Sequence, residues 1–174
     1  MAMRTFSRLD VRAVKPSRTS PIHVNVRFGL LFFAVQTLWI LGEFALGWHT
    51  TDVDVTRGTQ GLFFLPAVGV MAWGLLAKKR ADGHLAYRSA LAMGAVVGLV
   101  VGALSVPFHM AYITWLNPDY AANMIASMVA TGQATLEEAT AQFAMPSYLL
   151  GLFVFPIIAG VLTNAVLGAF LRSR

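Results

Sequence analysis

The sequence predicts an all-α polytopic membrane protein, a bundle of four transmembrane helices with an external amphipathic helical hairpin between the third and the fourth. Hydrophobic residues make up 57% of the chain and charged residues only 12%, about half the charged share of soluble domains. A spanning helix needs about 20 mostly apolar residues. Four stretches approach or exceed that length: 28–48, 60–77, 89–116 and 147–171.

Basic residues are distributed unevenly around the four predicted spans. Of the 13 Lys and Arg residues, only Arg57 falls in a loop on the side opposite the two termini. This bias predicts a membrane protein with both termini in the cytoplasm and with membrane lipids as neighbours. The net charge of +5 is therefore attributed to orientation, and no nucleic-acid partner is expected.

The chain divides into a basic cytoplasmic tail, residues 1–27, and a membrane domain, residues 28–174. Within the tail, Arg4, Arg8 and Arg12 recur every four residues. That spacing fits a short basic helix that contacts lipid or a partner. The alternative is a leader that only sets the topology.

The first two spans are joined by a short polar loop, residues 50–59. The Trp48-His49 pair before it is typical of an interfacial anchor, and the loop itself is expected to be solvated. Span two ends at the basic run 78–80, and the short loop that follows makes spans two and three antiparallel neighbours.

Two rows of small or polar residues are expected to make the closest helix contacts. In span three they are Ala90, Gly94, Gly98 and Gly102, and in span four Gly160, Asn164 and Gly168. Membrane helices associate through close backbone approach, which such rows allow. A packing partner in the same chain is favoured over one in another subunit.

The external loop, residues 117–146, is interpreted as two short helices. Asn117 is the expected N-cap of the first, and Gly132 its left-handed C-cap. Thr135 opens a capping box for the second, and Pro146 is expected to end it.

One face of the first short helix is rich in methionine, with Met124 and Met128 four residues apart. Methionine packs adaptably against varied surfaces. The helix pair is interpreted as a lid packed on the spans. The alternative is a docking surface on which these methionines contact a partner or an amphiphile.

Several of these features together resemble a known family. They are spans three and four, the Tyr87-Arg88 pair before them, the Asn-Pro-Asp-Tyr run at 117–120 and the Met-rich loop. The chain is similar to a bacterial family of four-span membrane proteins, the domain of unknown function family 4199, over most of residues 28–172. The resemblance implies the architecture and, with the charge bias, a bacterial inner (cytoplasmic) membrane. It implies no activity, so it transfers no functional residues.

Two ionisable side chains, Glu43 and His109, fall inside the predicted spans. Such residues are functional candidates by default. Both lie toward the external ends of their helices, so they can form a proton relay or pair with each other. The alternative is that Glu43 is hydrated near the interface and His109 bonds a carbonyl freed by Pro107. The other histidines, His23, His49 and His84, lie outside the spans and form no ligand spacing.

Sequence motifs for chemistry are missing from the chain. It has no Cys, nucleophile elbow, P-loop, dinucleotide fingerprint or zinc-protease motif. We therefore predict no catalytic residues, no metal site and no cofactor, with His109 as a weak candidate ligand for a metal or tetrapyrrole.

Three functions remain compatible with the sequence. The first is a non-catalytic accessory or assembly subunit of a larger membrane complex, respiratory or photosynthetic, with other membrane subunits as partners. The second is a small transporter or lipid-handling protein that uses Glu43 and His109. The third is a membrane enzyme that acts on lipid with His109 as base.

Overall fold

The computed structural model describes residues 21–51 and 53–173, and this part of the chain is all-helical with no strand. It contains six α-helices and one π-helical turn, η1. In chain order they are α1 (Pro21–Ala45), α2 (Val53–Asp82), α3 (Tyr87–Ala111), η1 (Tyr112–Leu116), α4 (Tyr120–Ala130), α5 (Leu136–Phe143) and α6 (Met145–Leu171). The predicted fold class is confirmed.

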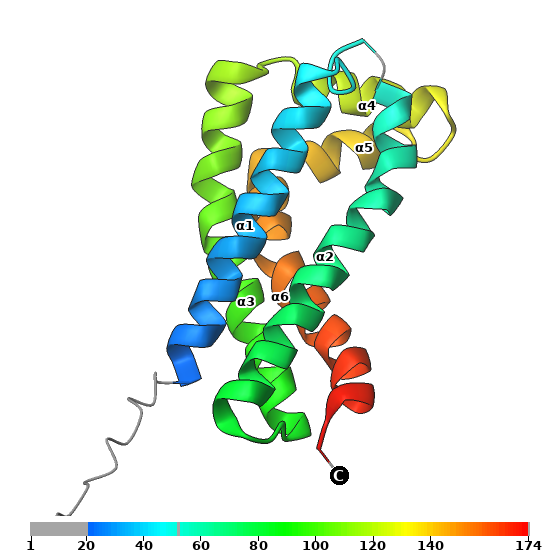
Figure 1. The fold of residues 1–174 in the computed structure, drawn as a ribbon. Coiled ribbons are helices and arrows are strands. Elements are labelled where there is room, and N and C mark those ends of the chain that lie inside the picture. The colour runs from blue at the N-terminus through cyan, green and yellow to red at the C-terminus, as the bar shows by residue number, and fades with distance from the viewer. Residues whose placement is uncertain (1–20, 52, 174) are drawn as a thin grey trace, which may run out of the picture.

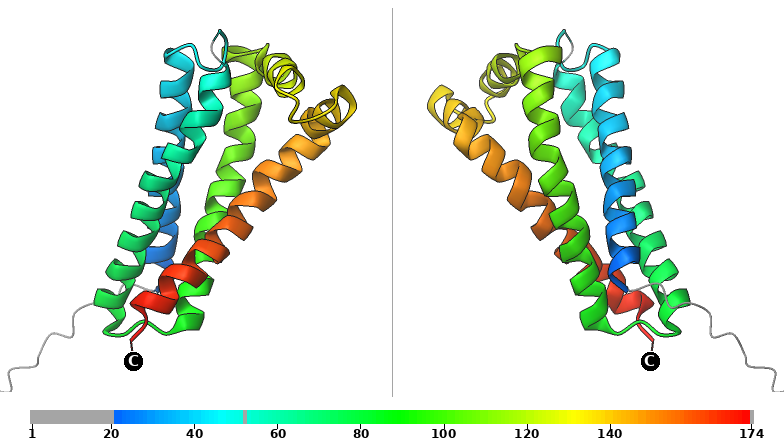
Figure 2. Two further views of the ribbon diagram at one scale, coloured as in Figure 1. Left: turned by 90° about the vertical axis from the view of Figure 1, so that its right-hand side faces the viewer. Right: turned by 90° about the vertical axis from the view of Figure 1, so that its left-hand side faces the viewer.

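The four long helices, α1, α2, α3 with η1, and α6, are each long and apolar enough to span a membrane. Helix α1 packs on α2 and α3, and α6 packs along α3 and also meets α2. Figure 2 shows that α6 crosses the bundle near its C-terminus and leans away from it toward its N-terminus. Helices α4 and α5 join the top of α3 to the start of α6 (Figure 1).

The bundle therefore has two different ends, which we name by their contents. The basic end holds the start of α1, the α2–α3 loop and the end of α6. The lid end holds the α1–α2 loop, η1, α4 and α5.

Helices α1 and α2 extend beyond the apolar stretches that predict them. Helix α1 begins at Pro21, within the segment assigned to the tail, because proline suits the first turn of a helix. Helix α2 begins at Val53, so the expected solvated loop at 50–59 is wrong over its second half. Thr56 and Thr59 are buried there, and each is held by a hydrogen bond to the segment around the end of α1.

The glycine row of α3 lies directly against the backbone of α6 in the same chain. A Cβ atom added at Gly94 would collide with the carbonyl oxygen of Gly160, and one at Gly98 would lie 2.5 Å from the Cα of Ile157. At Gly102 it would collide with the carbonyl oxygen of Phe153. These three positions admit glycine alone at this helix separation.

The same seam continues toward the basic end through Asn164 and Gly168. The side-chain amide of Asn164 donates to the carbonyl oxygen of Ala90 at 3.0 Å, and both residues are fully buried. A Cβ at Gly168 would lie 2.8 Å from that of Ala90. All seven predicted packing residues therefore belong to one α3–α6 interface.

The basic end is dry inside and closed by polar contacts around its rim. Its core is built from apolar side chains of α1, α2 and α3, among them Phe28, Met71, Leu75, Met93 and Val97. At the rim, the Ser173 amide donates to the Leu85 carbonyl at 3.0 Å, and the Leu85 amide donates to the Ser173 hydroxyl at 3.1 Å. The segment after α6 is thereby tied to the α2–α3 loop.

The lid consists of two short helices, as predicted, but their boundaries differ from two expectations. Gly132 is left-handed, with φ 66°, and Thr135 and Glu138 form the expected capping box. Asn117 is not the N-cap of α4, which begins three residues later at Tyr120. Pro146 does not end α5 but lies in the first turn of α6, where its missing N–H costs nothing.

Candidate functional site

A buried carboxylate–imidazole pair lies at the lid end of the bundle. Glu43 Oε2 is 3.3 Å from His49 Nε2, and Thr59 donates its hydroxyl to Glu43 Oε1 at 2.7 Å. Glu43 is 5% exposed and His49 3% exposed. An ion or a polar group so deeply buried in a membrane domain requires partners of this kind.

The chain reversal after α1 brings His49 back over Glu43. Helix α1 ends at Ala45, and Gly47 adopts φ 79°, a left-handed conformation that is accessible to glycine at little cost. The Trp48 amide then donates to the Glu43 carbonyl at 3.0 Å. This helix-ending turn places the next residue, His49, within reach of the carboxylate two turns earlier in the sequence.

The π-helical turn at the end of α3 supplies the next members of the site. The Asn117 amide donates to the Tyr112 carbonyl at 2.7 Å, the wide spacing typical of π-turns, which often occur at functional sites. The Tyr112 hydroxyl lies 2.6 Å from His49 Nδ1. The buried side chain of Asn117 donates to both the Tyr112 hydroxyl and the His49 carbonyl, each at 3.2 Å.

The first arm of the site runs from Glu43 through His49 and Tyr112 to Asn117. One assignment of protons satisfies all the hydrogen bonds between these residues. With an ionised Glu43 and a neutral His49 ring, the carboxylate accepts from His49 Nε2–H and Nδ1 accepts from the Tyr112 hydroxyl. The Tyr112 oxygen in turn accepts from Asn117. If a second proton arrives on His49, Nδ1 becomes a donor and the Tyr112 hydroxyl must reverse its direction.

A second arm begins at His109, one turn before Tyr112 on α3. His109 Nδ1 is 2.8 Å from the hydroxyl of Tyr148, which comes from α6 and also forms a hydrogen bond with Tyr120 of α4. The other ring nitrogen of His109, Nε2, is buried without a hydrogen-bond partner in the described structure. Burial, with the nearby Tyr112 and Glu43, raises the pKa of Tyr120 to about 12, so this hydroxyl stays protonated.

Aromatic edges join the two arms into one cluster. The ring centroids of His49 and Tyr120 are 5.3 Å apart, those of Tyr112 and Tyr120 5.6 Å, and those of His109 and Tyr112 6.3 Å. Each pair meets edge to face, a favourable arrangement for aromatic rings. We call this set the lid-end cluster; its members are Glu43, His49, Thr59, His109, Tyr112, Asn117, Tyr120 and Tyr148.

The structure brings the two predicted ionisable residues into the same cluster but does not pair them. The partner of Glu43 is His49, so the expectation of a direct Glu43–His109 pair is wrong. His49 is not among the candidates from the sequence, because it lies outside the predicted spans. The shared position of three of the four tyrosines near the predicted external ends was the available signal for the rest of the cluster.

The remaining sequence candidates lie elsewhere. Met124 is 7% exposed, so its assignment as a contact for a partner or lipid is wrong: it packs inward beneath the lid. Met128 is half-buried. Arg4, Arg8 and Arg12 lie outside the described residues.

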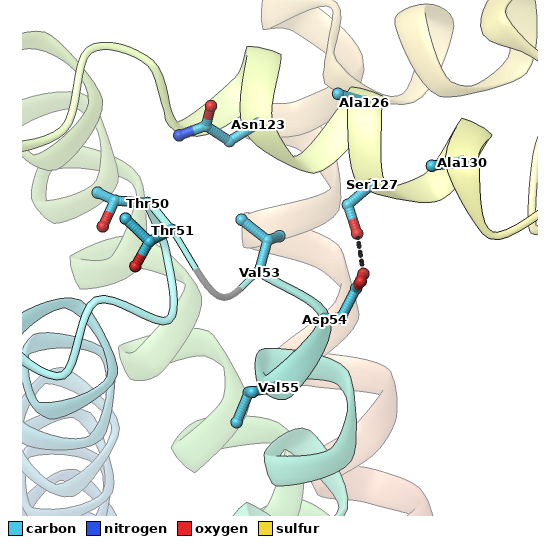
Figure 3. A pocket seen from close by; sticks show the side chains of 9 residues that line it. All are labelled: Thr50, Thr51, Val53, Asp54, Val55, Asn123, Ala126, Ser127 and Ala130. Carbon is cyan, nitrogen blue, oxygen red and sulfur yellow. Dashed lines mark hydrogen bonds between the residues drawn. The ribbon is translucent and has the colours of Figure 1, made fainter.

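An open pocket lies at the lid end between the start of α2 and α4 (Figure 3). Its volume is about 420 Å³, and Thr50, Asp54, Asn123 and Ser127 contribute polar groups to its lining. Ser127 donates to Asp54 at 2.6 Å, which ties α4 to the start of α2. Asn123 also donates to the His49 carbonyl at 3.3 Å, so this residue lies between the pocket and the cluster.

Toward the basic end the polar character of the interior fades quickly. Gln36 donates to Ser105 at 3.3 Å, one turn of α3 below His109. Beyond this contact lies the apolar core that contains Val97 and Met93. The cluster therefore adjoins an open pocket at the lid end, and an apolar core separates it from the basic end.

The side chains that could bind a metal ion are scattered in the described structure. Within 21–51 and 53–173, no three His, Asp or Glu residues come together in a way that could hold a metal ion. Glu43 and His49 are one ligand short, and the lone nitrogen of His109 does not complete the set.

Comparison with known proteins identifies the family. A family model described as "Protein of unknown function (DUF4199)" matches residues 27–173. Searches of curated proteins and of solved structures found no match.

Proposed function

This chain belongs to the DUF4199 family of proteins of unknown function, and we propose that it is a small transporter or lipid-handling membrane protein. Its working centre is the lid-end cluster, where the Glu43–His49 pair takes up and releases a proton. The observation that carries this proposal is the burial of that pair, 3.3 Å apart, inside a membrane-spanning bundle. Ionisable residues are costly in this environment and usually mark a pathway or a proton site.

The chemistry of the pair supports a switch. A proton added to His49 reverses the hydrogen bond of Tyr112, the residue at which α3 changes into the π-helical turn. Tyr112 also contacts Tyr120 of the lid. Proton uptake therefore acts on the joint between α3 and the lid, where a movable element can respond to a local change in hydrogen bonding.

The surroundings of the pair favour a one-sided site over a proton channel. The polar pocket lies on the lid side, and the apolar core closes the other side. We infer a site that is loaded from the lid side of the membrane. An amphiphile or lipid is the expected cargo because the adjoining faces of the bundle are apolar.

Proteoliposomes with trapped pyranine test this function across several classes of cargo. We would impose a pH gradient and add anionic, cationic and neutral single-chain amphiphiles in turn. At least one class is expected to cause proton movement with the native protein, and Glu43→Gln is expected to abolish it. Thr140→Ala, an exposed position of α5 outside both the cluster and the pocket, is the matched control that retains the response.

Identical traces for the native protein and Glu43→Gln across all three classes would contradict the proposal. Size-exclusion chromatography of each variant before reconstitution separates loss of folding from loss of transport. No catalytic step and no cofactor enter this proposal.

The orientation follows from the basic residues and is also proposed. We infer that the basic end, with both termini, faces the cytoplasm of a bacterial inner membrane and that the lid faces outward. Because the chain has no Cys, single cysteines can report the topology. Ala134→Cys is expected to react with an impermeant maleimide in intact cells, and Gly83→Cys only after permeabilisation.

A second function, an accessory or assembly subunit of a larger membrane complex, is favoured by one observation about α6. Only 11% of its most apolar stretch is buried inside the chain, against 39% for α3. A helix so little covered has room for another subunit. Stoichiometric membrane proteins recovered with the chain after gentle extraction would support this function, and recovery of the chain alone would count against it.

A further inference from the structure

The basic residues at the basic end fall into two groups with different surroundings. Lys78 is buried and pairs with Asp82 at 3.0 Å. Lys79 is half-buried and donates to the Leu171 carbonyl at 3.0 Å. Both lysine ammonium groups are thus engaged by the protein's own oxygens, and they close the bundle from inside.

The described arginines of the same end are all exposed. Each of the four spans contributes one exposed arginine at or beside this end: Arg27, Arg80, Arg88 and Arg172. An exposed apolar side chain lies within four residues of each arginine. These neighbours are Leu30, Leu76, Tyr87 and Phe170, the last of them 83% exposed.

The carboxylates are sorted to the opposite end of the bundle. Among the described residues, Asp82 is the one acidic side chain at the basic end, and Lys78 already engages it. Glu43, Asp54 and the other described acids lie at the lid end. The four guanidinium groups therefore face the surroundings of the bundle with little internal negative charge to engage them.

We propose that these four arginines form a binding surface for the headgroup phosphates of anionic phospholipids. A guanidinium group holds a phosphate through two parallel N–H donors, which an ammonium group does not. Leu30 and Leu76, three and four residues from Arg27 and Arg80, share a helix face with these arginines and are placed to contact the acyl chains of such a lipid. This combination fits a lipid rather than free phosphate, and it is independent of the proton site at the lid end.

Native mass spectrometry of the protein in nanodiscs of equal phosphatidylglycerol and phosphatidylcholine tests the surface. We would compare the retained lipid for the native chain and for two paired variants, Arg27→Gln with Arg80→Gln and Arg88→Gln with Arg172→Gln. The preference for the anionic lipid is expected to fall about fivefold for each arginine removed. The corresponding Arg→Lys pairs keep the charge and the topology, and they should lose part of the preference.

Lys78→Gln with Lys79→Gln is the matched control, because it removes two positive charges from the same end without removing an exposed arginine. Its preference for the anionic lipid is expected to equal that of the native chain. The proposal is overturned if the lysine pair lowers the preference as much as an arginine pair does. It is also overturned if the Arg→Gln pairs leave the preference unchanged, or if the Arg→Lys pairs retain all of it.

Discussion

The two ends of the bundle are held together by different physics. At the basic end, backbone meets backbone along the α3–α6 seam, and the interior is apolar. At the lid end α6 has moved away, and aromatic rings and a chain of hydrogen bonds fill the interior instead. Close packing leaves no alternative arrangement, whereas a hydrogen-bonded network can change when one proton is added. The contrast indicates a rigid basic end and a lid end that can respond to a change in protonation.

The largest expected effect on stability comes from disrupting the α3–α6 seam. Gly98→Val places a side chain where the Cα of Ile157 lies 2.5 Å from the new Cβ, so α3 and α6 must separate. We expect loss of more than about 3 kcal/mol, the upper range for overpacked cores, and little folded protein. Thermal unfolding in detergent measures this change.

Gly69→Ala is the control for that substitution, because nothing lies within 4 Å of the added Cβ. It should unfold at or slightly above the native temperature, since alanine favours helix over glycine. Equal destabilisation by the two variants would show that the close α3–α6 contact does not require glycine more than an open position does.

The next largest effect on stability is expected from a substitution in the lid-end cluster. Glu43→Leu leaves His49 and Thr59 without their shared acceptor. Removing one partner of a buried pair costs about 3–5 kcal/mol. The double variant Glu43→Leu with His49→Phe should recover part of this loss, because no ionisable side chain is then buried without its partner, and only the Thr59 and Tyr112 hydroxyls lose an acceptor.

A double-mutant cycle from chemical unfolding measures the coupling between positions 43 and 49. Coupling below about 0.5 kcal/mol, the range of independent sites, would mean that the pair contributes nothing as a unit. The lid end would then not be stabilised by its buried polar pair, contrary to the comparison drawn above.

A smaller effect is expected at the one polar contact inside the seam. Asn164→Leu removes the hydrogen bond to the Ala90 carbonyl. Such bonds between membrane helices contribute about 0.6 kcal/mol on average and up to about 1.7. Steric trapping or unfolding in mild detergent should resolve this loss of stability. A loss as large as that of Gly98→Val would mean that polar bonding, and not close backbone approach, dominates the stability of the basic end.

The smallest effect concerns the lid itself and depends on pH. Hydrogen bonds from the Thr135 backbone and side chain lower the pKa of Glu138 below its ordinary 4.5. The stabilisation of α5 by this cap is therefore present above the ordinary pKa and is lost as the pH falls through the lowered value. After correction for the intrinsic rate, hydrogen exchange of the α5 amides should become less protected on acidification in the native protein.

Glu138→Gln provides the reference for this measurement, because its cap cannot be protonated. Its exchange should show little dependence on pH after correction for the intrinsic rate. The same loss of protection in both proteins would assign the effect to another group.

The predictable parts of this molecule are those set by local periodicity. The four spans follow from apolar length, and the row from Ala90 to Gly102 follows from a spacing of four, because a helix places such residues on one face. The capping box at Thr135 is equally local. Each of these patterns involves residues close together in the sequence.

The lid-end cluster could not be predicted in this way, because its contacts join residues 63 and 39 positions apart, His49 with Tyr112 and His109 with Tyr148. The partner of Glu43 depends on the left-handed turn at Gly47, which decides where His49 lies. Asn117 was expected to cap a helix, a local role, but the π-helical turn redirects it into the cluster. Tertiary context decided all three.

The α3–α6 seam also has a consequence for how the chain is made. Helix α6 leaves the ribosome after α1, α2 and α3, so the glycine row of α3 is inserted before its partner exists. Lipid chains fill that furrow until α6 arrives and displaces them. The tie between Leu85 and Ser173 also depends on α6, so the basic end closes only after all four spans have been made.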